Sequence, residues 1–339
     1  MSAQAATPSA ASAAPPLALL CGASGFIGRH IACALRAAGW QVRPASRRSA
    51  PAVDYTRAIH ASDWQPLLQG ASAVINAVGV LRDSRARPMQ ALHADAPCAL
   101  FEACAASGVR RVIHISALGI DGGGPAARTP YARTKRQAEE RLLALTAQGR
   151  LDGIALRPSL VFGAGGASTR LFLALARLPV LALPRCAFTA RVAVWDLAEA
   201  VARLAASPAA SHAASHAANA RPLTGLLELA GPQPLTLAAY IQQLRASQGR
   251  PPACALALPA CITRASARLG DALPFSPWCT QSLHLLSAGN VASPAALPEL
   301  LGRPATAPAQ FMQALAAAAQ ADAPGVRKPQ NGRDEGGAP

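Results

Sequence analysis

The sequence lacks a long uninterrupted hydrophobic run, although 51% of its 339 residues are hydrophobic. The longest candidate, residues 171–184, is broken by Arg177 and Pro179, whereas a transmembrane helix needs about 20 consecutive, predominantly apolar residues. The first residues also lack the basic segment and the long apolar stretch of a signal peptide. We therefore predict a cytoplasmic protein without a transmembrane segment, whose contact with the inner face of the membrane would be peripheral.

The eight cysteines lack the patterns that bind metals. No two of them form a CxxC pair, and no histidine follows at zinc-finger spacing. His212 and His216 are four residues apart, a spacing that could bind a metal on a helix. They belong, however, to a repeated SHAA in a low-complexity stretch, and we attribute them to that repeat. The sequence therefore predicts free thiols in a reducing compartment and no metal site.

Acidic residues and lysines are also scarce. The chain has 17 acidic and 32 basic residues, a net charge of +15, and its only lysines are Lys135 and Lys328. A strong positive charge can indicate a nucleic acid, a membrane surface or an anionic ligand as partner. The arginines form no long block, and aromatic residues make up only 4% of the chain. We therefore expect a small-molecule substrate and no nucleic acid.

Short apolar runs alternate with segments of helical periodicity through the first half of the chain. Such runs, ending at glycine or polar residues, are typical of buried parallel strands. The alternation predicts an α/β fold with a doubly wound parallel sheet of the Rossmann type. The predicted strands are residues 17–23, 41–46, 73–79, 111–117 and 153–159, and the predicted helices are residues 26–38, 63–69, 89–107 and 131–148.

The pattern changes after the fifth predicted strand, and this change divides the chain into regions. We expect a disordered tail over residues 1–16, an NAD(P)-binding core over 17–160, a smaller C-terminal substrate-side region over 161–319 and a second disordered tail over 320–339. The C-terminal region is predicted to contain helices over 169–176, 196–206 and 235–244, a strand over 226–230 and a low-complexity insertion over 207–220.

The motif Gly22-Ala-Ser-Gly25-Phe-Ile-Gly28 directly follows a predicted strand and opens a predicted helix. Glycines let the backbone approach a pyrophosphate, and the helix N-terminus presents free N–H groups and the positive end of its dipole. This arrangement predicts a nucleotide site, the alternative being a tight turn without a ligand. The residues predicted to bind the cofactor here are Gly22, Ser24, Gly25, Phe26, Ile27 and Gly28.

The second predicted strand is followed by Ser46-Arg47-Arg48, with no acidic residue before Asp54. Sites that prefer NAD usually have Asp or Glu here to bind the ribose 2′-hydroxyl, whereas two guanidinium groups suit a 2′-phosphate. Arg47 and Arg48 therefore favour NADP(H) as the cofactor and leave NAD(H) open. An ordinary basic turn in an Arg-rich protein is the alternative.

Tyr131-Ala-Arg-Thr-Lys135 contains one of only three tyrosines and one of only two lysines. Residues four apart lie on the same side of a helix, so the ammonium can lower the pKa of the phenol toward neutrality and make it a general acid. Arginine could not replace this lysine, because a guanidinium keeps its proton. We therefore predict that Tyr131 and Lys135 are catalytic, the alternative being an exposed helix start.

Further candidates end successive predicted strands, where doubly wound folds bind ligands. Ser116 ends the fourth strand, and its hydroxyl could orient a substrate carbonyl, so we predict that it is catalytic. Pro158 ends the fifth strand, at the level where a nicotinamide would lie. The residues predicted to bind the cofactor at the end of the third strand are Asn76, Ala77, Val78 and Gly79.

Together these residues resemble the short-chain dehydrogenase/reductase superfamily, in its extended and atypical members, which are NAD-dependent epimerase/dehydratase-like. The segments GASGFIGRHI, VINAVGVLRD, VIHISALG, YARTK and LRPSLVFG are similar to the group that contains the nucleotide-binding accessory subunit of respiratory complex I. The resemblance covers about residues 17–245. One departure is His93, which stands where many members of the superfamily have Asn.

The resemblance implies an NADP(H)-dependent oxidoreductase, or an epimerase/dehydratase-like enzyme, with a Ser–Tyr–Lys mechanism. Tyr131 would exchange a proton with the substrate oxygen, Lys135 would hold the nicotinamide ribose, and Ser116 would steady the carbonyl. The alternative is a non-catalytic NADPH-binding assembly or sensor protein of a respiratory membrane complex, because some members of the group hold NADPH without known turnover.

The substrate pocket is expected in the C-terminal region, from residue 162 onward. The candidate lining is apolar, which indicates an apolar or quinone-like substrate, although the same side chains could form an ordinary core. The candidate lining residues are Leu171, Phe172, Leu175 and Leu178.

Overall fold

The structure is a computed structural model that describes residues 14–122, 124–185, 188–207, 223–273 and 276–321. The predicted tails fall largely outside these ranges. The predicted low-complexity insertion, with His212 and His216, also lies outside the described residues.

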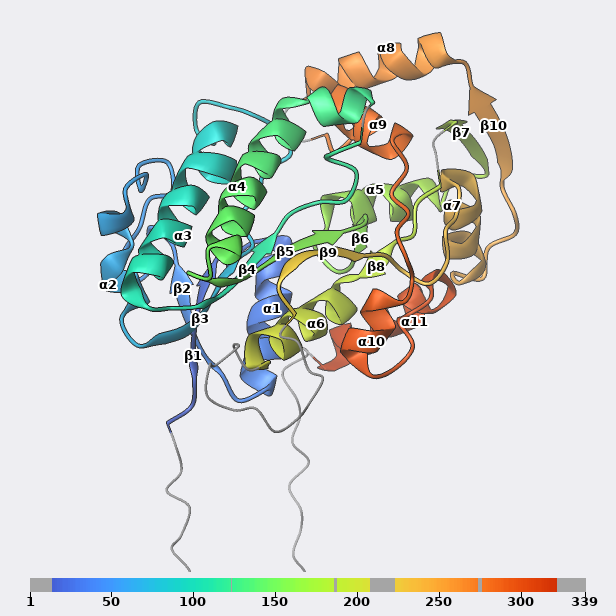
Figure 1. The fold of residues 1–339 in the computed structure, drawn as a ribbon. Helices are drawn as coiled ribbons and strands as arrows, with labels where there is room; N and C mark the ends of the chain where they lie inside the picture. Colours follow the sequence, from blue (N-terminus) through green and yellow to red (C-terminus); the bar gives the residue numbers. More distant parts are fainter. Residues whose placement is uncertain (1–13, 123, 186–187, 208–222, 274–275, 322–339) are drawn as a thin grey trace, which may run out of the picture.

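A six-stranded parallel sheet forms the centre of the protein, with the strand order β2-β1-β3-β4-β5-β9 (Figure 1). Its strands alternate between two cores, since Ala18 and Leu20 of β1 face one core and Leu19 and Cys21 face the other. Coverage of both faces explains why the strands read as continuous apolar runs. The predicted doubly wound parallel sheet is confirmed. Its strands are β1 (Leu17–Cys21), β2 (Gln41–Ala45), β3 (Ala71–Asn76), β4 (Arg111–Ile115), β5 (Asp152–Pro158) and β9 (Gly225–Leu229).

Helices cover both faces of this sheet (Figure 1). One layer consists of α1 (Phe26–Ala37), α6 (Val194–Ala206) and α10 (Ala296–Leu301). The opposite layer consists of α2 (Gln65–Leu68), α3 (Ala96–Ser107) and α4 (Pro130–Ala147). Among the helices that the structure describes, none combines the length and the apolar composition needed to cross a bilayer.

Two predicted helices differ from the observed ones. The helix predicted over 63–69 begins at Gln65, because Asp63 lies in a 3-10 turn (Ala61–Asp63) and its carboxylate accepts the backbone N–H of His60. The helix predicted over 89–107 occupies these residues, but it contains a π-helical turn (Ala91–Asp95) that the sequence did not predict, directly before α3. Pro97 follows this π-helical turn in the first turn of α3, where it has no backbone N–H to donate.

The C-terminal region builds a third core beside the sheet, in which the rings of Phe162 and Phe311 stack and that of Tyr240 packs edge-on. Thr236 was predicted inside a helix over 235–244, but it precedes the observed helix and caps it, since its hydroxyl accepts the N–H of Ala239. Two parallel strand pairs belong to this region: β6 (Val161–Phe162) with β8 (Val192–Ala193), and β7 (Val180–Pro184) with β10 (Cys254–Leu258). Its helices are α5 (Ala167–Leu175), α7 (Leu237–Ala246), α8 (Ala260–Asp271), α9 (Thr280–Ser287) and α11 (Phe311–Ala321). One 3-10 turn (Pro308–Gln310) precedes α11, and another (Pro125–Arg128) precedes α4.

A buried ion pair fixes α4 against β5. Arg157 of β5 donates to the carboxylate of Glu139 of α4 through Nη2 at 2.6 Å and through Nε at 3.0 and 3.2 Å. Arg157 also donates to the carboxylate of Asp121. Both Arg157 and Glu139 are buried, so neither charge can find water in place of its partner.

We expect Glu139→Gln to lower the free energy of unfolding by about 3 kcal/mol, because it leaves much of the Arg157 charge uncompensated. Chemical denaturation measures the change. The matched control is Glu140→Gln, since Glu140 is exposed and its replacement should cost no more than about 0.5 kcal/mol. Equal effects of the two substitutions would contradict this role of the pair.

Candidate active site

The residues singled out in the sequence lie along one edge of the sheet, because all strands of a parallel sheet end at the same side. Gly22 follows β1, Arg47 follows β2 and Ser116 follows β4. Asn76 and Pro158 are the last residues of β3 and β5. The neighbours β2 and β3 flank β1 on opposite sides, so the edge near β1 is the topological switch point where doubly wound folds bind ligands.

The glycine turn between β1 and α1 has a shape that only glycines allow. Gly22 has a φ of 79°, and a Cβ on Gly28 would lie 2.0 Å from the carbonyl oxygen of Gly22. The N–H of Gly25 donates to the Gly22 carbonyl at 2.9 Å. Gly25 precedes α1 without a side-chain cap, and Ser24 is exposed in the turn. The turn therefore forms an open cradle that fits a pyrophosphate.

Phe26 and Ile27 contribute to this turn through their backbone. Their side chains pack against the core on the α1 side of the sheet, and the ring of Phe26 lies close to Gly163 and Gly166 of the loop after β6. Their N–H groups belong to the first turn of α1, whose amides have no partner within the helix. The side chains thus anchor the start of the helix, and the amides face the cradle.

Arg47 and Arg48 lie beside the phosphate turn. Together with Ala23 and Ser24 of the turn, they line a cavity of about 740 Å³. Both arginines are exposed, and within the described ranges no carboxylate lies within ion-pair distance of either guanidinium. The structure therefore brings two available cations next to the pyrophosphate cradle, as a 2′-phosphate would require.

The loop after β3 is shaped from within by Asn76. The side-chain oxygen Oδ1 of Asn76 accepts the N–H of Val78 at 3.2 Å, and its side-chain nitrogen Nδ2 lies 3.1 Å from Nδ1 of His114. A Cβ on Gly22 would lie 2.9 Å from the backbone of Ala77. Asn76 thus acts as a support for the loop, and the backbone of Ala77 and Val78 lies against the phosphate turn.

Lys135 ties the start of α4, which carries Tyr131, to the loop after β3 and to the end of β4, which Ser116 follows. The ammonium of Lys135 donates to the carbonyl oxygens of Ile115 at 2.9 Å and Val78 at 3.3 Å. Ser116 is buried, and its hydroxyl has no hydrogen-bond partner among the described residues. Tyr131 lies one turn before Lys135 on α4. An unsatisfied buried hydroxyl beside these groups is the feature expected where a ligand atom binds.

The expectation that Lys135 lowers the pKa of Tyr131 is wrong for the protein without ligands. Burial of the phenol, together with the charge of Glu139, raises the pKa of Tyr131 to about 12. Burial also lowers the pKa of Lys135 to about 8, and its ammonium is bonded to backbone carbonyls. Tyr131 therefore keeps its proton at neutral pH and can act as a proton donor.

His93 connects three parts of the site. Its Nε2 accepts the N–H of Val80 at 2.9 Å, and its Nδ1 lies 3.1 Å from the hydroxyl of Thr134, which donates to Pro130. The ring of His93 packs edge-on against that of Tyr131, with centroids 5.3 Å apart. Burial and the charge of Lys135 lower the pKa of His93 to about 2. His93 is thus a neutral positioning residue.

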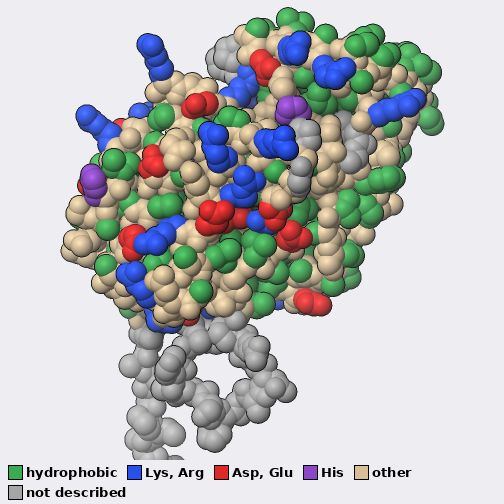
Figure 2. All heavy atoms as spheres, turned by 45° about the horizontal axis from the view of Figure 1, so that its top comes forward, with side chains coloured by type: hydrophobic (Ala, Val, Ile, Leu, Met, Phe, Trp, Pro, Cys, Tyr) green, Lys and Arg blue, Asp and Glu red, His purple; other side chains and the backbone are tan. Residues whose placement is uncertain are grey.

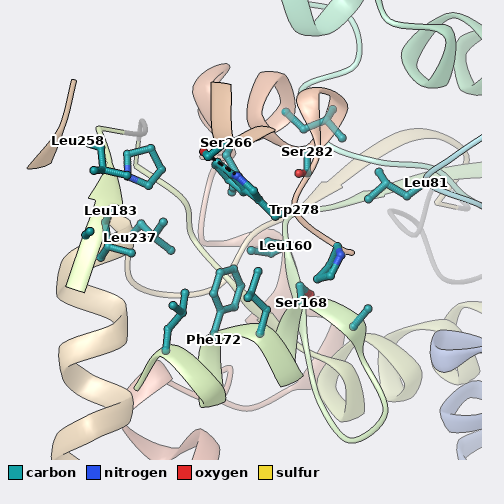
Figure 3. Close-up of a pocket in the computed structure, with 18 residues that line it drawn as sticks. Leu81, Leu160, Ser168, Phe172, Leu183, Leu237, Leu258, Ser266, Trp278 and Ser282 are labelled. Carbon is teal, nitrogen blue, oxygen red and sulfur yellow. Dashed lines mark hydrogen bonds between the residues drawn. The ribbon is translucent and has the colours of Figure 1, made fainter. Parts of the chain in front are cut away.

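An apolar cavity of about 510 Å³ opens beside this edge (Figure 3). Leu81 and Leu160, from the loops after β3 and β5, line it on the side of the sheet. Leu171, Phe172 and Leu175 line it as predicted, whereas Leu178 does not and is 47% exposed. The wall opposite α5 consists of side chains that sequence reasoning did not single out: Leu258, Ser266, Trp278 and Ser282.

Arg82 holds this second wall in place. Its guanidinium donates to the carbonyl oxygens of Gly270 at 2.7 Å, in the last turn of α8, and of Ser276 at 2.8 Å and Leu273 at 2.9 Å, in the connection to α9. The residue follows Leu81 directly, so the loop that lines the cavity also ties the wall to the sheet. Sequence reasoning missed Arg82, because backbone acceptors leave no pattern in the sequence.

Known proteins match much of the chain. Residues 18–215, more than half of the sequence, match the NAD dependent epimerase/dehydratase family. A ceramide reductase of Caulobacter vibrioides is 30% identical over 200 residues, which cover 55% of this chain and 58% of that relative. The chain thus spans less than two thirds of the length of this relative.

Solved structures share the fold at low sequence identity. An NADPH-dependent quinone oxidoreductase of Escherichia coli, solved with NADPH, has 18% identity and a TM-score of 0.61 over 88% of this chain and 99% of its own. A UDP-glucose 4-epimerase of Thermus thermophilus, solved with NAD, has 18% identity and a TM-score of 0.61 over 89% of this chain and 99% of its own. These likenesses establish the parallel α/β fold.

The lowered pKa of Lys135 predicts a pH-dependent stability. Between about pH 8 and the ordinary lysine pKa of about 10.4, the unfolded chain binds a proton that the folded chain does not. The stability of the wild type relative to Lys135→Met should therefore rise by about 3 kcal/mol as pH increases through this window. Urea denaturation across the window measures this difference, and a constant difference would contradict the shifted pKa.

Proposed function

The chain belongs to the NAD dependent epimerase/dehydratase family, and we propose that it is an NADP(H)-dependent oxidoreductase that reduces an apolar carbonyl compound. The observation that carries the proposal is the hydrogen bond from Lys135 to the carbonyl oxygen of Ile115, the residue before Ser116, which brings the helix of Tyr131 and Lys135 to this strand end. In this position a substrate carbonyl could reach the phenol and the unsatisfied hydroxyl of Ser116 together.

The residues along the sheet edge fit a nicotinamide dinucleotide. The turn from Gly22 to Gly28 would hold the pyrophosphate, and Arg47 and Arg48 would bind the 2′-phosphate. Gly79 lies next to Lys135, since a Cβ there would be 3.4 Å from the ammonium nitrogen, and Lys135 would bind the nicotinamide ribose. The bound cofactor supplies or accepts a hydride. Relatives of the same fold bind either NADPH or NAD, so Arg47 and Arg48 are the support for NADP(H).

The side chains of the site favour reduction. Burial raises the pKa of Tyr131 to about 12, so the phenol carries its proton at neutral pH and could donate it to the substrate oxygen as negative charge develops there. Ser116 would donate a second hydrogen bond to that oxygen. Lys135 would bind the ribose hydroxyls and, once turned toward the phenol, stabilise the phenolate left after proton transfer.

The cavity supports an apolar substrate. Its lining is dominated by leucine, alanine and aromatic carbon, with a few hydroxyl groups, which is the usual character of a pocket for a lipid-like molecule. The names of two relatives, a ceramide reductase and a quinone oxidoreductase, point the same way. We therefore assign a ketone or quinone with a long apolar part as the substrate class.

A non-catalytic NADPH-binding assembly or sensor protein of a respiratory membrane complex is the second candidate. The observation that favours it is the ammonium of Lys135, which is bonded to two backbone carbonyls and does not activate Tyr131 in the free protein. In such a protein the same residues would hold the nucleotide without turnover.

We expect Tyr131→Phe to lower the rate of NADPH oxidation by quinones and long-chain ketones by about 10² to 10⁴. NADPH binding, followed by nicotinamide fluorescence, should stay within about twofold, since Tyr131 acts on the substrate. The matched control is Tyr240→Phe, because the hydroxyl of Tyr240 is buried without a hydrogen-bond partner in the described chain.

Two outcomes would contradict the catalytic assignment. Unchanged activity of Tyr131→Phe would remove Tyr131 from the mechanism. Tight NADPH binding by the wild type, with no oxidation by any quinone, aldehyde or ketone, would favour the assembly or sensor protein.

The preference for NADP(H) is tested by replacing both arginines of the basic turn. Arg47→Ala with Arg48→Ala should weaken NADPH binding by about 100-fold and NADH binding by less than about threefold, since only NADPH carries the 2′-phosphate. The control pair is Arg36→Ala with Arg250→Ala, two exposed arginines away from the turn. Equal weakening of both nucleotides by Arg47→Ala with Arg48→Ala would refute the preference.

A further inference from the structure

The outer side of α8 carries an unpartnered apolar stripe. Ile262, Ala265 and Leu269 follow one another at intervals of three and four residues, so they share one side of the helix. Ile262 is 51% exposed and Leu269 is 68% exposed. Among the described residues, α8 buries only its opposite side, which contains Thr263, Ala267 and Gly270.

Exposed hydrophobic side chains continue this stripe on the neighbouring elements. Leu256 of β10 and Val180 of β7 are 54% and 48% exposed, and Leu273 directly follows the helix. The elements α8, β10 and β7 form one end of the molecule, at the upper right of Figure 1. Figure 2 shows hydrophobic side chains and arginines together at this end. Exposed apolar patches of this kind mark surfaces that bind another protein, a ligand or a membrane.

Basic side chains border the apolar stripe. Arg264 and Arg268 are four residues apart on the adjoining side of α8, and both are exposed. Arg264 also lines a groove of about 580 Å³ with Arg185 and His284, and no acidic residue lines this groove. Within the described ranges neither arginine of α8 has a carboxylate at ion-pair distance. An apolar stripe with a basic border is the pattern of a helix that lies in the interface of an anionic bilayer.

The same helix separates the stripe from the apolar cavity. Ser266 lines the cavity and lies one turn after Ile262. Leu258, just before α8, lines both the cavity and the basic groove. The side chain of Trp278 joins this wall, since its Nε1 donates to Ser266 at 3.2 Å (Figure 3). The surface, the groove and the cavity are therefore continuous at one helix.

We propose that α8, with the exposed edge of β10 and β7, docks the protein on an anionic lipid bilayer. Ile262 and Leu269 enter the acyl boundary, Arg264 and Arg185 bind lipid phosphates, and the cavity faces the membrane through the wall formed by α8. The passage of a substrate from the bilayer into the cavity rests on the proposed function, whereas docking itself does not.

Flotation of the full chain with vesicles tests the proposal. The protein should float with vesicles of phosphatidylcholine containing about one third phosphatidylglycerol, and binding should fall at least about fivefold with phosphatidylcholine alone. Binding should also weaken as salt rises. Absence of flotation with the anionic vesicles would overturn the proposal.

Matched variants assign the binding to α8. Leu269→Glu should reduce vesicle binding at least about tenfold, because it places a charge in the acyl boundary. Ile59→Glu is the control, since Ile59 is 47% exposed near α2, and it should bind like the wild type. Both substitutions are at exposed positions, and equal thermal unfolding would show that both variants fold. Equal binding by the two variants would overturn the assignment to this surface.

A second pair tests the basic border. Arg185→Gln with Arg264→Gln should lower binding to anionic vesicles by roughly fivefold per residue and leave binding to phosphatidylcholine vesicles unchanged. Arg36→Gln with Arg57→Gln serves as the control, because both residues are exposed elsewhere on the protein. Equal losses in the two double variants would overturn the role of the groove.

The oligomeric state in solution distinguishes docking on a bilayer from association between copies of the chain. Activity measurements distinguish docking from the proposed function. If the wild type is a dimer in solution and Leu269→Glu is a monomer that no longer floats, the stripe is a contact between copies and the proposal fails. If Leu269→Glu reduces a water-soluble quinone at the wild-type rate but loses activity on a long-chain quinone in vesicles, docking and the proposed function are both supported. A wild type that floats but oxidises no NADPH would refute only the proposed function.

Discussion

The buried ammonium of Lys135 is the constraint on which the rest of the site depends. A charge removed from water needs compensation from nearby acceptors, and here the carbonyls of Ile115 and Val78 supply it, supported by the charge of Glu139 one turn further along α4. Glu139 is in turn held by Arg157 of β5. The loop after β3, the end of β4 and the helix α4 therefore cannot shift separately without exposing a charge to an apolar surrounding. These contacts also fix the position of Tyr131, because it lies one turn before Lys135 on α4.

The parts of the fold that depend on local signals were predictable. Continuous apolar runs predict strands covered on both faces, and Gly28 is predictable because no other residue fits against Gly22. Asp63 was predicted inside a helix over 63–69 but precedes the observed helix, since it lies in a 3-10 turn and its carboxylate accepts the N–H of His60. The pKa of Tyr131 could not be predicted from its spacing to Lys135, because it depends on burial that exists only after folding. Arg82 was missed for a related reason: its acceptors are carbonyls of residues about 190 positions away along the chain, which sequence patterns do not reveal.

The excess of arginine looks like a uniform background in the sequence, but in the structure the guanidinium groups have different roles. Arg157 binds a carboxylate through two nitrogens in the core, and Arg82 reaches several carbonyls at once. Both tasks use the planar array of donors that an ammonium lacks. At position 135 the basic residue is a lysine, and its ammonium can give up a proton more easily than a guanidinium, since burial lowers its pKa to about 8. The choice between the two basic residues thus follows the chemistry of each position.

A bilayer as the source of substrate changes what the cavity must recognise. A lipid chain that leaves water gains roughly 25 cal/mol for each Å² of apolar surface that it buries, but a chain that leaves a bilayer is already in an apolar medium and gains little. The leucine side chains of the cavity then give the apolar chain of the substrate a path and a shape to fit, but they add little to its binding affinity. Selectivity would then come from polar contacts that the bilayer interior does not offer. The hydroxyls of Ser266 and Ser282, which line the cavity, already bond to the protein, whereas the buried hydroxyl of Ser116 has no partner among the described residues. A hydroxyl already satisfied by the protein could not distinguish a carbonyl from a hydrocarbon, whereas a buried hydroxyl such as that of Ser116 could.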